Sequence, residues 1–91
     1  MKSVKAFVLS GCPYCRNAMK AWDELTAAPE YSDVRIDWIN ENQYPEIARS
    51  YDYYYCPTMF VDDEKVYEAH PDEQYEETKK NVEKVLMKAV E

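Results

Sequence analysis

Two cysteines three positions apart are the part of this 91-residue chain that most directly indicates chemistry. They form the segment Cys12-Pro13-Tyr14-Cys15, while the third cysteine, Cys56, stands alone. The thiolate is the form that attacks a disulfide, and a free cysteine with a pKa of about 8.5 is mostly protonated near neutral pH. A helix that begins at the first cysteine stabilises its anion through unpaired backbone N–H groups and the helix dipole. We therefore predict Cys12 as the nucleophile and Cys15, one turn further along the helix, as the resolving thiol.

The residues around the pair predict the elements that this chemistry needs. Val4–Leu9 is rich in β-forming and apolar residues, which is typical of a buried strand. Gly11, the only glycine of the chain, breaks that strand directly before the first cysteine. Pro13 suits the first position of a helix, where its missing N–H is not needed, and Pro29 ends the helix. This strand, turn and helix place the first cysteine at a helix N-terminus.

The rest of the chain continues the alternation of strands and helices. The further expected elements are strands at Val34–Ile39, Thr58–Val61 and Lys65–Glu68 and a short helix at about 42–51. Pro71 and Asp72 are expected to open a final helix, with Asp72 as its N-cap. The order β-α-β-α-β-β-α predicts an α/β fold in one domain, residues 1–91. Its first two strands are expected to be parallel, the hairpin to extend the same sheet, and helices to cover both faces.

Composition and charge exclude several classes of protein. Hydrophobic residues make up 46% and charged residues 32% of the chain, which is typical of a globular protein. The net charge of −7 is carried entirely by residues 39–91, and this acidity argues against nucleic acid or an anionic membrane as a partner. No apolar run approaches the roughly 18 residues of a membrane-spanning helix. The apolar run of the basic N-terminal segment is too short for a signal peptide, so we expect a reducing cytosol. We also expect a monomer.

The number and spacing of the cysteines also bear on metal binding and disulfides. An odd count without an export signal does not favour a disulfide scaffold. A zinc site would have to draw on Cys12, Cys15, Cys56 and His70. The last two do not form the second close pair that structural zinc sites usually have. We therefore expect no metal, and we expect His70 to lie exposed and uninvolved in the loop before the final helix.

Two segments of the chain resemble a known family. Ser10-Gly11-Cys12-Pro13-Tyr14-Cys15-Arg16 is similar to the active site of dithiol glutaredoxins, within the thioredoxin-fold superfamily. Cys56-Pro57-Thr58-Met59-Phe60-Val61-Asp62 resembles the segment in which that superfamily carries a cis-proline. The element order agrees from Val4 to Val90. The resemblance implies a minimal glutaredoxin-type, thioredoxin-like fold with a four-stranded mixed sheet. It also implies that Pro57 is cis, opposite the cysteines, and that the Cys56 backbone pairs with an extended substrate.

The chain departs from the glutaredoxin pattern at the expected glutathione site. Leu9 stands where glutaredoxins usually carry a basic residue that meets a carboxylate of glutathione. Tyr67-Glu68 stands where they carry two glycines that let the backbone approach the ligand. The bulk of Tyr67 and the charge of Glu68 are expected to weaken binding, so we expect glutathione to be a poor reductant. The Trp that precedes the first cysteine in typical thioredoxins is also absent.

Further substrate contacts are expected from residues that flank the two segments. Pro13 and Tyr14 lie between the cysteines, and Tyr55 precedes Cys56-Pro57. We expect the rings of Tyr14 and Tyr55 to form an aromatic rim, because aromatic side chains bind peptides well. For Cys56 we expect a small hydrophobic packing role. The alternative is a third redox thiol within reach of the dithiol.

The function that these patterns favour is thiol–disulfide exchange. Cys12 is expected to attack a protein disulfide or a glutathione mixed disulfide, and Cys15 to release the product. No metal or organic cofactor is needed, and glutathione or a dedicated reductase would supply the electrons. Two alternatives stay open: a metal or iron–sulfur binding module that uses Cys12, and a non-catalytic protein-binding domain of the same fold.

Overall fold

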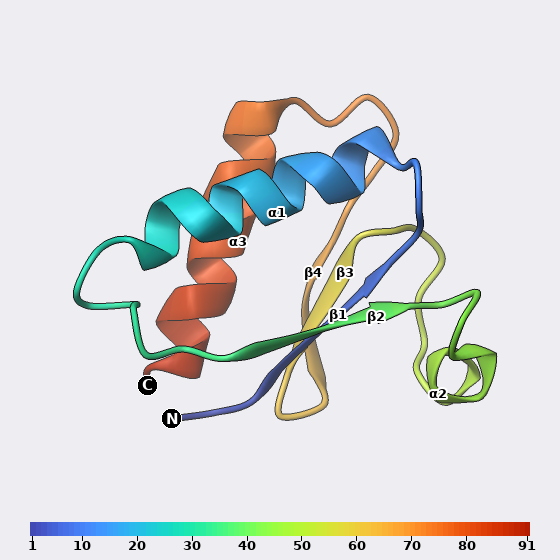
Figure 1. Ribbon diagram of the computed structural model, residues 1–91, viewed down its shortest axis with the longest axis horizontal. Coiled ribbons are helices and arrows are strands. Elements are labelled where there is room, and N and C mark those ends of the chain that lie inside the picture. The colour runs from blue at the N-terminus through green and yellow to red at the C-terminus, as the bar shows by residue number, and fades with distance from the viewer.

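Seven elements follow one another in the order predicted from the sequence (Figure 1). The computed structural model describes all 91 residues. The elements are β1 (Val4–Val8), α1 (Pro13–Thr26), β2 (Ile36–Asn40), α2 (Pro45–Arg49), β3 (Thr58–Val61), β4 (Glu64–Glu68) and α3 (Tyr75–Ala89). No helix has both the length and the apolar character that crossing a bilayer requires.

The four strands form one mixed sheet in the order β2-β1-β3-β4. β1 and β2 are parallel and are joined through α1, whereas β3 runs antiparallel to both β1 and β4. The predicted hairpin therefore extends the same sheet, and the mixed four-stranded α/β fold is confirmed. Because β1 and β2 are parallel, their C-terminal ends lie at the same edge of the sheet, where α1 begins.

The hairpin turn between β3 and β4 forms without glycine. Its two central residues, Asp62 and Asp63, have positive φ angles of 47° and 68°. Two-residue hairpin turns of this kind need positive φ at both positions, and Asp tolerates that conformation better than most residues. The Asp62 carboxylate also accepts a hydrogen bond from the Ser3 N–H at 3.1 Å, which ties the turn to the start of β1.

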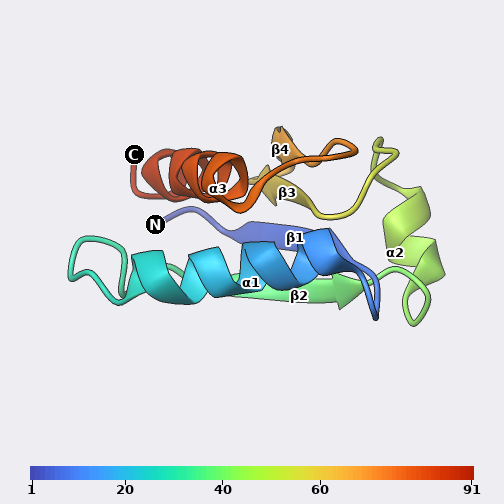
Figure 2. The same cartoon turned by 90° about the horizontal axis from the view of Figure 1, so that it is seen from above.

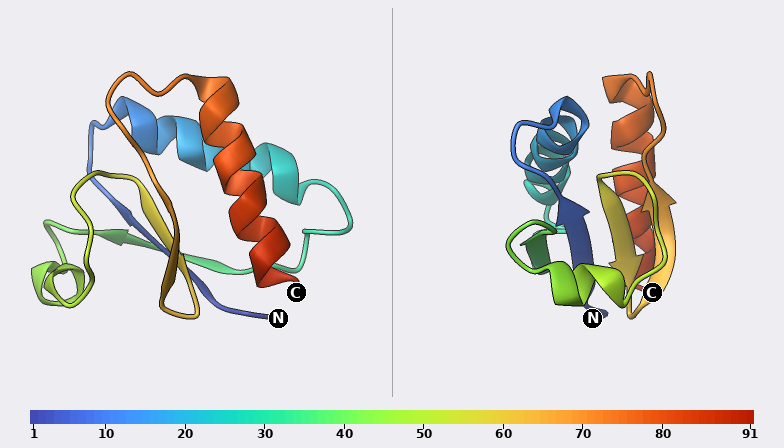
Figure 3. Two further views of the ribbon diagram at one scale, coloured as in Figure 1. Left: turned by 180° about the vertical axis from the view of Figure 1, so that it is seen from behind. Right: turned by 90° about the vertical axis from the view of Figure 1, so that its right-hand side faces the viewer.

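The two faces of the sheet are covered differently. α1 and α3 lie side by side over one face, and α2 lies beyond the other (Figures 2 and 3). The main core lies under α1 and α3; among its fully buried members are Val4, Ala6, Ala18, Ala21, Met59, Val82, Val85, Leu86 and Ala89. On the opposite face Phe7, Ile39 and Phe60 pack against Ala48 of α2 and the rings of Tyr51 and Tyr53. Alternate residues of β1 therefore serve two separate cores, as the period of two in a strand requires.

Two helix boundaries differ from those predicted. α2 spans only Pro45–Arg49 instead of about 42–51, because Asn40 holds the preceding residues in a turn through its backbone and side chain. α3 begins at Tyr75 with Gln74 at its N-cap, so the predicted start and cap at Pro71 and Asp72 are wrong. Asp72 instead has a φ of +67°, which no helix accepts, and its N–H points to another part of the chain.

Candidate active site

Cys12 lies at the start of α1, as the sequence predicts. Gly11 turns the chain after β1 with a φ of +74°; a side chain at this position would meet nothing within 4 Å, so the backbone angle is what requires glycine. Cys12 is the N-cap, and its Sγ accepts a hydrogen bond from the Cys15 N–H at 3.3 Å. Pro13 follows at the first helical position and is exposed. The half-buried sulfur thus takes the place of the side-chain oxygen in an ordinary N-cap.

The two thiols of the pair have different environments. Cys15 lies one turn further along α1 and is only 2% exposed, whereas Cys12 is partly accessible. Burial, together with the hydrogen bond to Cys12, raises the pKa of Cys15 to about 12. The Cys15 thiol is therefore protonated at neutral pH and shielded from reagents in solution. All three cysteines of the chain are free thiols.

The segment opposite the cysteines contains the predicted cis peptide bond, between Cys56 and Pro57. The Cys56 carbonyl oxygen lies 3.8 Å from the Sγ of Cys12, which donates to it. The Cys56 N–H has no hydrogen-bond partner in the chain. Pro57 itself is less than 2% exposed, and its carbonyl accepts the Ala69 N–H at 2.9 Å. A peptide that approaches Cys12 would therefore meet the backbone of Cys56, while the proline ring stays inside.

The Cys56 side chain makes a polar contact, so the expectation of a purely hydrophobic packing role is wrong. Its Sγ donates to Glu41 Oε1 at 2.8 Å, and the same oxygen accepts the Tyr53 hydroxyl at 3.1 Å. Burial, followed by the hydrogen bond to the Glu41 carboxylate, raises the pKa of the Cys56 thiol. Cys56 is thus held protonated beside the dithiol, which makes it a weak nucleophile.

Glu41 is a site residue that the sequence analysis missed. It directly follows β2, and its N–H donates to the carbonyl of Val8, the last residue of β1, at 3.1 Å. The parallel pairing of these strands therefore brings Glu41 to the edge of the sheet from which α1 starts. The negative charge of Glu41 also contributes to the raised pKa of Cys15. A single acidic residue after a strand is the only signal of this role in the sequence.

The two rings expected to form a rim have different roles. The Tyr14 hydroxyl accepts a hydrogen bond from the Asp72 N–H at 2.9 Å, which joins the cysteine segment to the loop between β4 and α3. Tyr14 is half-buried in this position. Tyr55 is 52% exposed and the adjacent Tyr54 is 87% exposed. The rings free for contact are therefore those of Tyr54 and Tyr55, while Tyr14 supports the loop.

Glu68 supports the segment that leads to the cis peptide bond. Its Oε2 accepts the N–H groups of Tyr54 and Tyr55 at 2.6 and 2.8 Å, and its Oε1 pairs with Lys65 at 2.9 Å. Partial burial raises the pKa of Glu68, but the bonds from Lys65 and the two N–H groups outweigh this effect, so the net shift is downward. The charge that was expected to repel glutathione is thus engaged by its own neighbours.

Tyr67, the other residue at the expected glycine pair, belongs to the core. It is 3% exposed, and its hydroxyl donates to the carboxylate of Glu73. Burial raises the pKa of Tyr67, so the phenol remains a donor. Two glycines at positions 67 and 68 would remove both this contact and the support for the Tyr54–Tyr55 segment.

Comparison with known proteins agrees with this geometry. No curated protein matches the chain. The family model described as a thioredoxin domain matches residues 2–77. The matched part contains the cysteine pair, the cis-proline segment and all four strands, which together make up the site described above. The chain therefore belongs to the thioredoxin-domain family.

Proposed function

We propose that the protein is a thiol–disulfide oxidoreductase that uses the Cys12–Cys15 dithiol. The observation that carries this proposal is the placement of the two sulfurs. Cys12 caps a helix beside the Cys56 carbonyl, and Cys15 is buried one turn behind it. One thiol is accessible to a substrate, and the other is reserved for the second step.

The proposed exchange proceeds in two steps. The Cys12 thiolate attacks one sulfur of a substrate disulfide, the substrate S–S bond breaks, and the other substrate sulfur leaves as a thiolate. The Cys15 thiol then loses its proton, for which the departing thiolate is an acceptor, and attacks the Cys12 sulfur. This step breaks the mixed disulfide, releases the second substrate thiol and leaves a Cys12–Cys15 disulfide. Two electrons have then passed from the protein to the substrate.

Extended peptide segments of disulfide-bonded proteins are the substrates that we propose. The Cys56 N–H lacks a partner within the chain, and the Tyr54 and Tyr55 rings are exposed beside it. A bound peptide can accept a hydrogen bond from the Cys56 N–H and cover the two rings, as in other cases of backbone pairing at a free edge. Glutathione is proposed as a weak alternative, because Leu9 offers no charge for its carboxylates. A dedicated reductase is then the better electron donor in a reducing cytosol.

The roles of the two thiols are tested by reduction of insulin in the presence of dithiothreitol. We expect Cys12→Ser to abolish the reaction. In a parallel reaction without dithiothreitol, which would cleave the intermediate, reduced Cys15→Ser is expected to accumulate a mixed disulfide between Cys12 and the substrate, which mass spectrometry detects. Cys56→Ser is the matched control, since a hydroxyl can still donate to Glu41, and it should retain most activity. Full activity of Cys12→Ser, or a mixed disulfide on Cys56 instead of Cys12, would contradict the proposal.

The electron donor is tested by two coupled assays on the wild-type protein, one with glutathione and glutathione reductase and one with thioredoxin reductase. We expect faster turnover with the second. Leu9→Lys should raise turnover with glutathione, because one charge-assisted contact contributes about 1.5–3 kcal/mol and each 1.4 kcal/mol is about tenfold in affinity. Glu68 is left unchanged in this test, since it supports the Tyr54–Tyr55 segment.

A further inference from the structure

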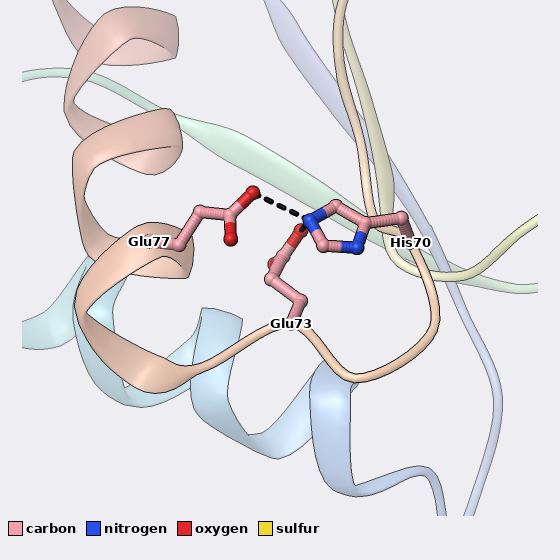
Figure 4. A group of neighbouring side chains, drawn as sticks. All are labelled: His70, Glu73 and Glu77. Atoms are coloured by element: carbon pink, nitrogen blue, oxygen red, sulfur yellow. Dashed lines mark hydrogen bonds and ion pairs between the residues drawn. The ribbon is translucent and has the colours of Figure 1, made fainter.

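His70 is not uninvolved, in contrast to the expectation from the sequence. It lies in the loop between β4 and α3, and its half-exposed ring faces two carboxylates (Figure 4). The distance from its Nε2 is 2.5 Å to Glu77 Oε2 and 3.8 Å to Glu73 Oε1. One potential ligand atom from each of the three side chains lies within 4.8 Å of the other two. The arrangement brings the only histidine of the chain into a cluster with two acids.

Glu73 has one carboxylate oxygen that is buried without a partner. The residue is 3% exposed, and its Oε2 accepts hydrogen bonds from the Tyr67 hydroxyl and from Thr78 Oγ1, the latter at 2.5 Å. Its Oε1 receives no hydrogen bond and faces His70. Burying a carboxylate oxygen without a donor is unfavourable unless a cation or a hydrogen bond compensates it. The unpaired Oε1 of Glu73 therefore favours a positively charged ligand in the cluster.

The ring of His70 is oriented in the way that a metal ligand requires. Its Nδ1 lies 2.8 Å from the carbonyl oxygen of Pro71, which is an acceptor only. Nδ1 can donate its proton to this carbonyl, while Nε2 faces only the carboxylates of Glu77 and Glu73 and is the nitrogen that a cation between the three side chains would bind. Histidines that bind metals nearly always donate their other N–H to such a carbonyl or carboxylate, and ligating carboxylates are themselves hydrogen-bonded, as Glu73 is.

We propose that His70 Nε2, Glu73 Oε1 and Glu77 Oε2 bind one divalent transition-metal cation of the Zn²⁺ class. One imidazole and two carboxylates form a donor set that suits such ions, and the two negative charges balance the cation. Zinc bonds of about 2.0–2.2 Å in a tetrahedron set the ligand atoms roughly 3.3 Å apart. The pair at 3.8 Å has to close slightly, and the exposed Glu77 has to move back from His70 to admit the ion. A water molecule would complete the tetrahedron.

The proposed ion would fasten the loop between β4 and α3 to the first turns of α3. His70 and Glu73 belong to this loop, whereas Glu77 belongs to the helix. The same loop carries Asp72, whose N–H holds Tyr14 of the cysteine segment. No cysteine takes part in the cluster, so this site is independent of the proposed thiol chemistry. The competing explanation is an ion pair between a protonated His70 and Glu77, which needs no metal.

Zinc titration by isothermal calorimetry tests the proposal, with all three cysteines changed to Ser so that the dithiol cannot bind the probe. We expect one Zn²⁺ per chain. His70→Asn and Glu77→Gln should each weaken binding by about 100-fold or more, and Tyr67→Phe, which removes a donor to Glu73, by about 10- to 100-fold. Glu76→Gln is the matched control, because Glu76 is exposed on the same turn and has no partner, and it should bind like its parent. Circular dichroism verifies that each variant is folded.

Nuclear magnetic resonance of the same cysteine-free protein gives a second measurement, made directly at the histidine. Only one imidazole is present, so its nitrogen signals belong to His70. The proposal predicts that the Nε2 signal shifts as Zn²⁺ is added and stops shifting at one Zn²⁺ per chain. No binding by the cysteine-free protein, an unshifted imidazole, or equal affinities of Glu77→Gln and Glu76→Gln would overturn the proposal and leave an ordinary ion pair.

Discussion

Changing Glu68 to Gln tests how the segment before the cis-proline is held. The carboxylate accepts two backbone N–H groups, from Tyr54 and Tyr55, and pairs with Lys65. Hydrogen bonds to a charged group contribute about 1.5–3 kcal/mol each, and neutral ones about 0.5–1.5 kcal/mol. The partly exposed pair with Lys65 adds about 0–1 kcal/mol. Glu68→Gln preserves the shape but removes the charge, so we expect the free energy of unfolding to fall by about 1–3 kcal/mol at pH 7.

The dependence on pH separates this electrostatic effect from a loss of packing. The pKa of Glu68 is lowered in the folded protein, so its contribution is complete above the pKa of the unfolded carboxyl, about 4.3. It disappears as the pH falls through the lower folded value, because both states are then protonated. Wild type and Glu68→Gln should therefore differ at pH 7, and the difference should shrink progressively as the pH falls below about 4.3.

Urea unfolding at several pH values measures both effects. Glu64→Gln is the control, since Glu64 lies on the same strand, is exposed, and makes only a 3.8 Å pair with Lys88. It should change the free energy of unfolding by less than about 0.5 kcal/mol. Glu68→Gln should also slow the rate at which the protein reduces insulin, because the loosened segment carries the Cys56 backbone. An unchanged stability at pH 7, or an equal deficit at pH 3 and pH 7, would refute this explanation of Glu68.

The remaining predictions concern the thiols. Cys12 should be alkylated by iodoacetamide much faster than Cys15 near neutral pH, since Cys15 is buried and has a pKa of about 12; equal rates measured by peptide mapping would contradict this. Glu41→Gln should lower the pKa of Cys56, because it removes a negative charge that opposes the thiolate, and alkylation of Cys56 should begin at lower pH. An unchanged alkylation profile would mean that burial alone sets that pKa. Cys56→Val should lower the free energy of unfolding by about 1 kcal/mol, since it removes a donor to Glu41, whereas Cys56→Ser should retain most of it.

The parts of the structure predicted correctly depend on local features of the chain. The first strand is observed at Val4–Val8, one residue shorter than predicted, and it is followed by the turn at Gly11 and a helix that Cys12 caps. Neighbouring residues whose local preferences agree account for all three. The hairpin was also predicted from its two strand-like segments although its turn lacks glycine, and in the structure Asp62 and Asp63 adopt the positive φ angles that the turn needs. Periodicity, proline and glycine therefore sufficed for the order of the elements and for the place of the cysteine pair.

The errors come from contacts between residues that are distant in the sequence. Asp72 was predicted to cap α3, but its N–H is bound by Tyr14, which is 58 residues away, and α3 begins later. Glu41 was missed because it meets Cys56 only through the pairing of β2 and β3 on either side of β1. His70 was placed correctly in its loop, yet its neighbours depend on the course of that loop into α3. Residue types alone do not specify such contacts.

The bond between Tyr14 and Asp72 also provides a natural probe of the candidate active site. The Asp72 amide lies in an exposed loop, so without this bond its hydrogen would exchange with water almost as fast as in an unfolded chain. Its exchange rate therefore measures how often Tyr14 swings away, as a free energy of local opening. Tyr14 lies between the two cysteines, so oxidation of the dithiol or docking of a peptide should alter that rate. One backbone amide, followed by exchange in D₂O, would thus monitor the redox state without a label.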